Sequence, residues 1–280
     1  MNSDTTLTTR RRLPTRGSGR AAAAALAAAT ALLALAACSS SADGASDERT
    51  SAADPDEQTS DTTGKHTKPQ RLLWMGDSIA EVEAPALGAA MKSAGVEFGS
   101  MAAAGGGGVV GKELAAGTWK DLPKKLKSFR PDVVAYQITT YDWGTPDEQR
   151  AAYARLAKTV EDAGAELLIV SAPPFKLDDF YKKHEAEIKT APRSAAKVAA
   201  ERPDTVHHLD ATALWGAAST AAKAQRSKDG IHSCQQGSAS FAKWFGEQLG
   251  KRYGFEPAPV DKWATGAWTG DKAYSRLGCA

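Results

Sequence analysis

From residue 71 onward, short apolar runs alternate with longer segments in which apolar residues recur every three or four positions. The short runs predict buried strands, and the longer segments predict helices with one face against a core. We predict strands over residues 72–75, 96–101, 132–139, 166–171 and 206–209, and helices over 85–94, 122–129, 146–163, 182–200 and 241–249.

Turn and capping residues mark the boundaries of these segments. Gly76 and Gly164 each follow an apolar segment, and Pro131 ends a helical one. Thr145-Pro146-Asp147-Glu148 combines an N-cap, a proline at the first helical position and a capping box. Strands that alternate with helices form a parallel sheet covered on both faces. We therefore predict an α/β fold with three layers, α/β/α, in which sites form at the carboxyl ends of about five strands.

The N-terminal segment has the composition of an export signal. Ala21 to Ala37 is an uncharged run of alanine and leucine with one threonine, and five arginines precede it. This pattern predicts a signal peptide over residues 1–37. The run is shorter than the ~20 apolar residues of a spanning helix, with a plain transmembrane anchor as the alternative. The arginines leave Sec and twin-arginine export both open; they are Arg10, Arg11, Arg12, Arg16 and Arg20.

Leu35-Ala36-Ala37-Cys38 at the end of this run resembles a bacterial lipobox. The resemblance implies cleavage before Cys38 and a diacylglyceryl thioether on its sulfur, with fatty acyl chains such as palmitate holding the protein at a membrane surface. Residues 39–70 contain no aromatic residue and no Val, Ile or Leu, which predicts a flexible tether. We therefore predict an extracytoplasmic, lipid-anchored protein whose folded domain spans residues 71–280.

Composition and cysteine content narrow the possible partners and the class of protein further. The 280 residues carry 35 Lys and Arg against 33 Asp and Glu, a net charge of +2, which argues against nucleic acid as a partner. No internal repeat is visible, and we expect a monomer. An exported domain permits oxidation of Cys234 and Cys279, so we predict a disulfide between them; two separate buried thiols are the alternative.

Two short motifs carry candidate chemistry. Gly76-Asp77-Ser78 follows the first predicted strand, and Asp229-Gly230-Ile231-His232 precedes the last predicted helix. A serine hydroxyl needs a base to take its proton, and an imidazole needs a carboxylate to orient it. Ser78, His232 and Asp229 supply these three roles. The alternative is structural: Ser78 caps the next segment, Asp229-Gly230 forms an ordinary turn, and His232 lies on the surface.

These motifs, in this order on an alternating α/β pattern, resemble the SGNH (GDSL) hydrolase family over residues 71–253. The resemblance implies a flavodoxin-like fold, ester hydrolysis without a cofactor, and Ser78 as nucleophile with its own N–H in the oxyanion hole. The family's second block is best matched by Gly105, with Gly106 next, and its N–H would be a further oxyanion donor. Gly237 and Phe241 continue the expected entry into the last helix.

The third block of the family, Gly-x-Asn-Asp, is not matched, because the aligned residues here are Thr139-Thr140-Tyr141-Asp142. Loss of the asparagine donor lowers the rate by ~10²–10³ in comparable enzymes. A hydroxyl of Thr140 or Tyr141 is a candidate replacement, and packing is the alternative role of Tyr141. The departure resembles divergent SGNH domains associated with glycan O-acyltransferases, in which a sugar hydroxyl accepts the acyl group.

Other notable residues receive structural interpretations. His207-His208 has no carboxylate or cysteine at ligand spacing, so we predict no metal site. The aromatic residues Trp263, Trp268 and Tyr274 of the C-terminal tail either stack on sugars or cover apolar surface. We predict a serine esterase acting on acyl or acetyl esters of small molecules or cell-envelope glycans. The alternatives are an O-acyltransferase and a catalytically silent glycan-binding module.

Overall fold

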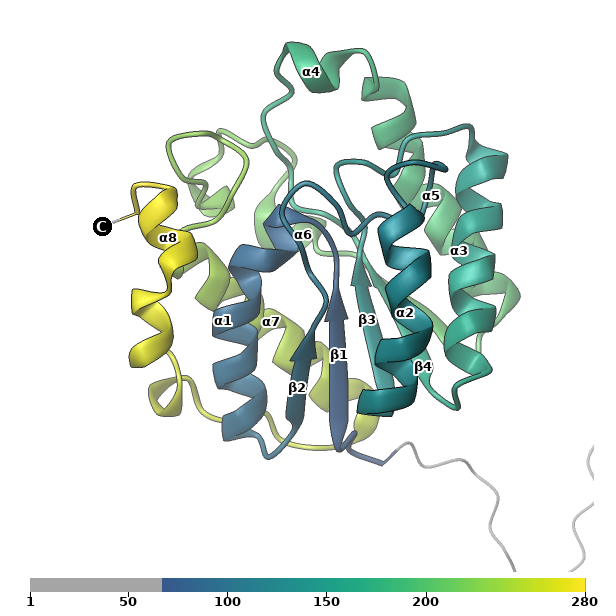
Figure 1. Cartoon of the computed structure of the whole chain (residues 1–280). Helices are drawn as coiled ribbons and strands as arrows, with labels where there is room; N and C mark the ends of the chain where they lie inside the picture. Colours follow the sequence, from purple (N-terminus) through teal and green to yellow (C-terminus); the bar gives the residue numbers. More distant parts are fainter. Residues whose placement is uncertain (1–66, 280) are drawn as a thin grey trace, which may run out of the picture. The chain divides into compact units, whose positions relative to one another are not determined.

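The computed structural model describes residues 67–279. The predicted signal peptide, Cys38 and nearly all of the predicted tether lie outside these residues. Five parallel strands form one sheet in the order β2-β1-β3-β4-β5 (Figure 1). The predicted α/β class and flavodoxin-like topology are thereby confirmed. The strands are β1 (Arg71–Met75), β2 (Glu97–Ser100), β3 (Val133–Gln137), β4 (Glu166–Val170) and β5 (Val206–Leu209).

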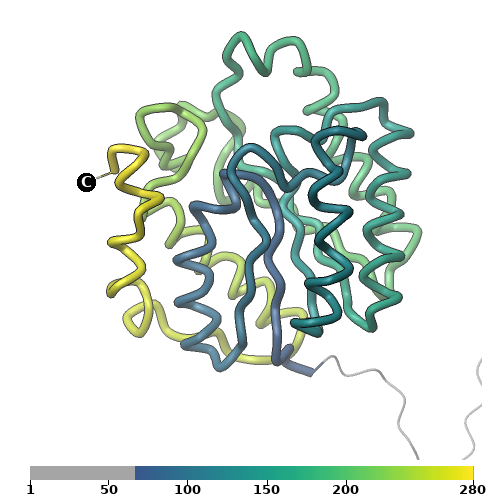
Figure 2. Tube along the Cα trace, viewed as in Figure 1, coloured from purple at the N-terminus to yellow at the C-terminus, as the bar shows by residue number. Residues whose placement is uncertain are grey.

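Helices cover both faces of the sheet, because successive side chains of each strand point to opposite faces. Leu73 and Met75 of β1 pack on one face and Leu72 and Trp74 on the other. Figure 2 traces the path of the chain through the sheet and the helical layer on each of its faces. The first face is covered by α2 (Ala116–Phe129), α3 (Pro146–Glu161) and α5 (Glu185–Glu201), and the second by α1 (Ser78–Ser93) and α7 (Gln235–Tyr253).

Helix α1 begins seven residues earlier than the pattern predicts, and this places Ser78 at its first position. Asp77 is the N-cap, and its carboxylate accepts a hydrogen bond from the N–H of Ile79 at 3.0 Å. Pro85 lies inside the helix, where it has no backbone N–H to donate to the carbonyl one turn earlier. The helix continues through it because Ile79 and Leu87 lie on the same buried face.

The predicted helix over residues 182–200 corresponds to α5 (Glu185–Glu201), which begins three residues later than predicted, and a separate short helix precedes it. A short α4 (Asp179–Lys182) is capped by Asp178, and α5 follows after His184. The ring of His184 stacks on Trp143 with centroids 3.6 Å apart, and its backbone departs from helical geometry. In contrast, the capping box of Thr145 and Glu148 at the start of α3 is confirmed.

The C-terminal tail packs against the domain. Trp263 and Tyr274 are almost fully buried, so these aromatic rings cover apolar surface. A disulfide joins Cys234, at the N-cap of α7, to Cys279, with their Cα atoms 5.6 Å apart. The tail also contains α8 (Lys272–Arg276), and a further short helix, α6 (Thr212–Trp215), follows β5.

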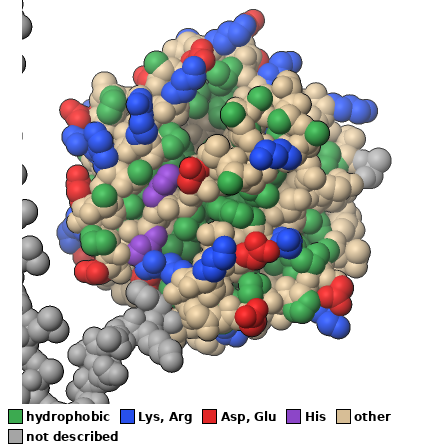
Figure 3. Space-filling model, turned by 180° about the vertical axis from the view of Figure 1, so that it is seen from behind, with side chains coloured by type: hydrophobic (Ala, Val, Ile, Leu, Met, Phe, Trp, Pro, Cys, Tyr) green, Lys and Arg blue, Asp and Glu red, His purple; other side chains and the backbone are tan. Residues whose placement is uncertain are grey.

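The surface of the described domain mixes charges of both signs. On the face turned away in Figure 1, basic and acidic side chains are interspersed around apolar ones (Figure 3). This distribution agrees with the low net charge of the sequence. Between residues 67 and 279, no helix is both long and apolar enough to cross a membrane.

Candidate active site

Ser78, His232 and Asp229 meet at the carboxyl end of β1. The Nε2 atom of His232 lies 2.8 Å from the hydroxyl oxygen of Ser78, and its Nδ1 atom lies 2.7 Å from Oδ2 of Asp229. The side chain of His232 is 19% exposed, so the site is open to a ligand at its rim. A base in contact with the nucleophile and oriented by a carboxylate is the arrangement that activates a serine.

The turn that carries Asp229 and His232 is held by its own hydrogen bonds. Oδ1 of Asp229 accepts from the hydroxyl of Ser227 at 2.7 Å and from the N–H groups of Ile231 and His232 at 2.7 and 3.0 Å. Partial burial alone would raise the pKa of Asp229, but these bonds and that of the imidazole lower it to about 2. The carboxylate of Asp229 therefore stays ionised at neutral pH.

Asp77 connects the nucleophile turn to the loop after β3. Its Oδ2 atom accepts hydrogen bonds from the N–H and the hydroxyl of Thr140, at 2.7 and 2.8 Å. Burial raises the pKa of Asp77, although the bonds from Thr140 and Ile79 act in the opposite direction. The hydroxyl of Thr140 thus donates to Asp77, which corrects its candidate role as an oxyanion donor.

The N-terminus of α1 provides the setting for an oxyanion. The first N–H groups of a helix have no intrahelical acceptor, and the helix dipole favours negative charge there. Because Ser78 occupies the first helical position, its N–H belongs to this group. This placement explains how one residue can supply both the nucleophile and a donor to the charge that develops during attack.

The glycine loop after β2 approaches the nucleophile turn most closely at Gly107. A Cβ atom on Gly107 would lie 1.9 Å from the carbonyl oxygen of Gly76, and its φ of +84° also favours glycine. A Cβ atom on Gly105 would meet no atom within 4 Å. The tight contact between this loop and the nucleophile turn therefore lies at Gly107. The donor role of Gly105 stays a prediction.

Asp142 fixes the same glycine loop to strand β3. Its buried carboxylate accepts from the N–H of Val109 at 3.2 Å and from the hydroxyls of Tyr136 and Tyr153 at 2.6 and 3.0 Å. Burial raises the pKa of Asp142 and of both tyrosines. This network supports the loop without contacting Ser78, so Asp142 is a structural residue of the site.

Tyr141 lies in an aromatic cluster above the sheet edge. Its ring centroid is 5.6 Å from that of Trp143 and 6.5 and 6.3 Å from those of Phe180 and Tyr181. Burial raises the pKa of Tyr181, whose hydroxyl also contacts the side chains of Thr140 and Tyr141. Phe180 is 50% exposed. The cluster thus forms an apolar wall beside the candidate site.

The loop between β4 and α4 contacts the catalytic turn directly. The N–H of Lys176 donates to the carbonyl of Gly230 at 2.8 Å, and a Cβ atom on Gly230 would lie 3.1 Å from Cβ of Lys176. In Figure 1, this loop and α4 project beyond the carboxyl ends of the strands. This loop therefore packs directly on the Asp229–His232 turn.

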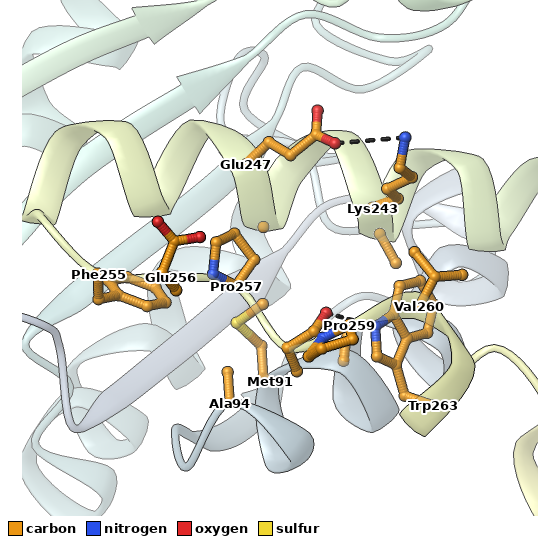
Figure 4. Close-up of a pocket in the computed structure, with 14 residues that line it drawn as sticks. Met91, Ala94, Lys243, Glu247, Phe255, Glu256, Pro257, Pro259, Val260 and Trp263 are labelled. Atoms are coloured by element: carbon orange, nitrogen blue, oxygen red, sulfur yellow. Dashed lines mark hydrogen bonds and ion pairs between the residues drawn. The ribbon is translucent and has the colours of Figure 1, made fainter.

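Two pockets lie apart from the triad. One, of about 660 Å³, has a mainly apolar lining near the carboxyl ends of β3 and β4 that includes Ile138, Phe175 and Leu177. The other, of about 260 Å³, lies between α1, α7 and the tail and is lined by Met91 and Trp263, with the Lys243–Glu247 ion pair along α7 (Figure 4). Met91 is roughly 20 Å from Ser78 along α1, at about 1.5 Å per residue. The smaller pocket is therefore separate from the candidate active site.

Of the two histidines on β5, His207 has protein partners. His207 contacts the guanidinium of Arg252 and lies 3.5 Å from Glu166, and burial lowers the pKa of His208. Within residues 67–279, no group of three or more potential ligands is placed to hold a metal ion.

The sequence motifs contain the three triad residues but not all of the residues that support them. They give no roles to Asp77, Asp142 and Tyr181, or to Arg226 beside the catalytic turn. Asp77 was accessible from sequence, because Asp before a helical segment is a common N-cap. Tyr181 and Arg226 had no such local signal.

Two solved structures with the same fold are distant from this chain in sequence. A GDSL-like lipase from Bacteroides thetaiotaomicron VPI-5482 is 14% identical, with a TM-score of 0.51 over 65% of this chain and 88% of its own. A protein assigned as an acylhydrolase, from Bacteroides fragilis NCTC 9343, is 14% identical, with a TM-score of 0.50 over 65% of this chain and 87% of its own. The sequence matches no protein-family model and no curated protein. These similarities show a shared fold.

Proposed function

We propose that this chain, which has the fold of the SGNH (GDSL) hydrolases, is a serine esterase with Ser78 as its nucleophile. The observation that carries the proposal is the 2.8 Å contact between His232 and the Ser78 hydroxyl, with Asp229 on the other imidazole nitrogen. His232 takes the proton of Ser78 as the hydroxyl attacks the ester carbonyl, and the alcohol leaves with that proton. Water then attacks the acyl-Ser78 with His232 again as base, which releases the acid and free serine.

The proposed substrates are acyl or acetyl esters of a small molecule or of a cell-envelope glycan. The aromatic wall of Tyr141, Trp143 and Phe180 supports this class, because aromatic faces pack well on acyl chains and on sugar rings. No cofactor is needed for the proposed chemistry.

Labelling of the full-length protein with a fluorophosphonate probe tests the esterase proposal. We expect the probe to modify Ser78, identified by mass spectrometry, and the protein to turn over p-nitrophenyl acetate. Both signals should disappear in Ser78→Ala. The control is Ser240→Ala, which removes a hydroxyl that donates to Gln225 at the surface, and this variant should retain both signals. A folded protein that stays unlabelled at Ser78 contradicts the proposal.

Acyl transfer to a sugar hydroxyl is a second candidate, favoured by one observation. Tyr141 replaces the asparagine donor, and its ring contributes to an aromatic surface that suits a sugar acceptor. In this case, acylated glycan forms faster than free acid when an acceptor glycan is supplied. A silent glycan-binding module would instead bind glycan without reacting with the probe.

We also propose that the protein is extracytoplasmic and attached to a membrane through a lipid on Cys38. The support is the sequence Leu35-Ala36-Ala37-Cys38 after an apolar run, together with a disulfide in the folded domain. Fractionation of cells that express Cys38→Ala tests the anchor. We expect the variant to leave the membrane fraction, and retention at wild-type level would contradict the lipid attachment.

A further inference from the structure

Buried polar side chains connect α1 and β3 to the segment that carries the catalytic turn. Glu83 of α1 is fully buried, and its Oε2 atom accepts a hydrogen bond from Nε2 of Gln137, the last residue of β3, at 2.7 Å. Arg226, three residues before Asp229, is the cation whose charge acts on Glu83. None of these three side chains has a part in the proposed chemistry so far.

The guanidinium of Arg226 donates hydrogen bonds to backbone carbonyls on both sides of Asp229. Its Nη1 atom donates to the carbonyl of Ile231 at 3.0 Å and its Nε atom to the carbonyl of Ala224 at 2.8 Å. Its plane lies over the ring of Trp215, with Cζ 4.5 Å from the centroid. The backbone of Arg226 also pairs with Ser233 in an antiparallel bridge. The side chain therefore spans both ends of the turn.

Three buried polar atoms of these residues have no hydrogen-bond partner in the described structure: Nη2 of Arg226, Oε1 of Glu83 and Oε1 of Gln137. Buried polar atoms without partners are uncommon in folded proteins, and one explanation is a functional role. Here they belong to a cation, a carboxyl group and an amide that lie near the base of the proposed enzyme. If these three positions had only to fill space in the core, apolar side chains of similar volume would suffice.

We propose that Arg226 is a positioning residue for the Asp229–His232 turn and that buried Glu83, when ionised, adds a counter-charge to that of Asp229. The proposal rests on the proposed esterase function, because the turn carries the base of that reaction. Arg226 touches no reacting atom. It acts by holding the backbone carbonyl of Ile231 in place. Because His232 is the next residue, this contact also holds the imidazole of His232 at hydrogen-bond distance from Ser78.

The charges around Glu83 make this arrangement sensitive to pH. Burial raises the pKa of Glu83 to about 8, Arg226 and Gln137 favour its ionised form, and the charge of Asp77 opposes it. From the tail, the hydroxyl of Tyr274 also faces this carboxyl group. Glu83 is thus mainly protonated at neutral pH and becomes an anion just above it. Ionised Glu83 attracts Arg226, which fixes the turn, so we expect the rate to rise through about pH 8.

The test compares pH profiles of full-length variants, measured as kcat/KM and as the rate of Ser78 labelling. We expect Glu83→Gln to lose the rise near pH 8. We expect Arg226→Met to lower kcat about 10²-fold with little change in KM, as for a misplaced catalytic group, and Arg226→Lys to recover part of this loss. The matched control is Glu81→Gln, on the same helix, whose carboxylate pairs at the surface with Arg276 at 3.5 Å; it should keep the wild-type profile.

Two outcomes would overturn the inference while leaving the esterase proposal intact: a wild-type pH profile in Glu83→Gln, or an unchanged kcat in Arg226→Met. If Arg226→Met does not fold, the profile of the nearly isosteric Glu83→Gln decides. A wild-type protein that is never labelled at Ser78 would instead refute the esterase proposal, on which the inference depends.

Discussion

Ser78→Ala, His232→Ala and the double variant should each lower kcat by about the same factor, roughly 10⁶, because the residues of such a triad act as a unit. Without His232, the Ser78 hydroxyl keeps its proton during attack; without Ser78, the base has no nucleophile to activate. We expect Asp229→Asn to lower kcat less, by roughly 10⁴, because the imidazole remains but loses its tautomer and orientation. Steady-state kinetics with p-nitrophenyl acetate measure all four variants.

Comparison of the single and double variants tests whether Ser78 and His232 act together or independently. Independent contributions would multiply, so a double variant far slower than either single one would contradict a joint role for Ser78 and His232. His207→Ala is the matched control, because it removes an imidazole whose partners are Arg252 and Glu166 on the distant edge of the sheet. It should keep kcat within a small factor.

Replacement of both Cys234 and Cys279 by serine should lower the free energy of unfolding by about 4 kcal/mol, the chain-entropy value for a loop of this size. The disulfide closes a separation of 45 residues and holds the tail against α1 and α7. For a domain of this size, that loss corresponds to a fall in Tm of roughly 8–16 °C. Urea unfolding gives the free energy, and thermal unfolding gives Tm.

Reductant provides the control for the disulfide prediction. Wild-type protein in reductant should unfold at the same urea concentration as the double serine variant, and the variant itself should not respond. Because Cys234 lies two residues after His232, we also expect the reduced protein to lose part of its esterase activity. A wild-type unfolding midpoint that is indifferent to reductant would contradict a stabilising role for the bond.

Features that depend on neighbouring residues can be read from the sequence. Short apolar runs predict all five strands because the sheet is buried on both faces, and period-3.6 patterns predict the main helices because each buries one face. The capping box at Thr145 was readable for the same reason, since its four residues are consecutive. Asp229 and His232 could be paired because a short turn brings residues three apart together, and the structure places Nδ1 of His232 at 2.7 Å from Asp229.

How residues far apart in sequence share the site depends on the packing of the whole domain. That packing gives the hydroxyl of Thr140 to Asp77, places the tight glycine contact at Gly107, and brings Tyr181 beside Tyr141. It also places Arg226 across the catalytic turn, where the charges of buried Glu83 and of Asp229 act on it. Hydrophobic periodicity reports whether a side chain is buried, but not which partner it meets. That partner depends on how loops from different strands converge at one sheet edge, and this is decided when the layers pack.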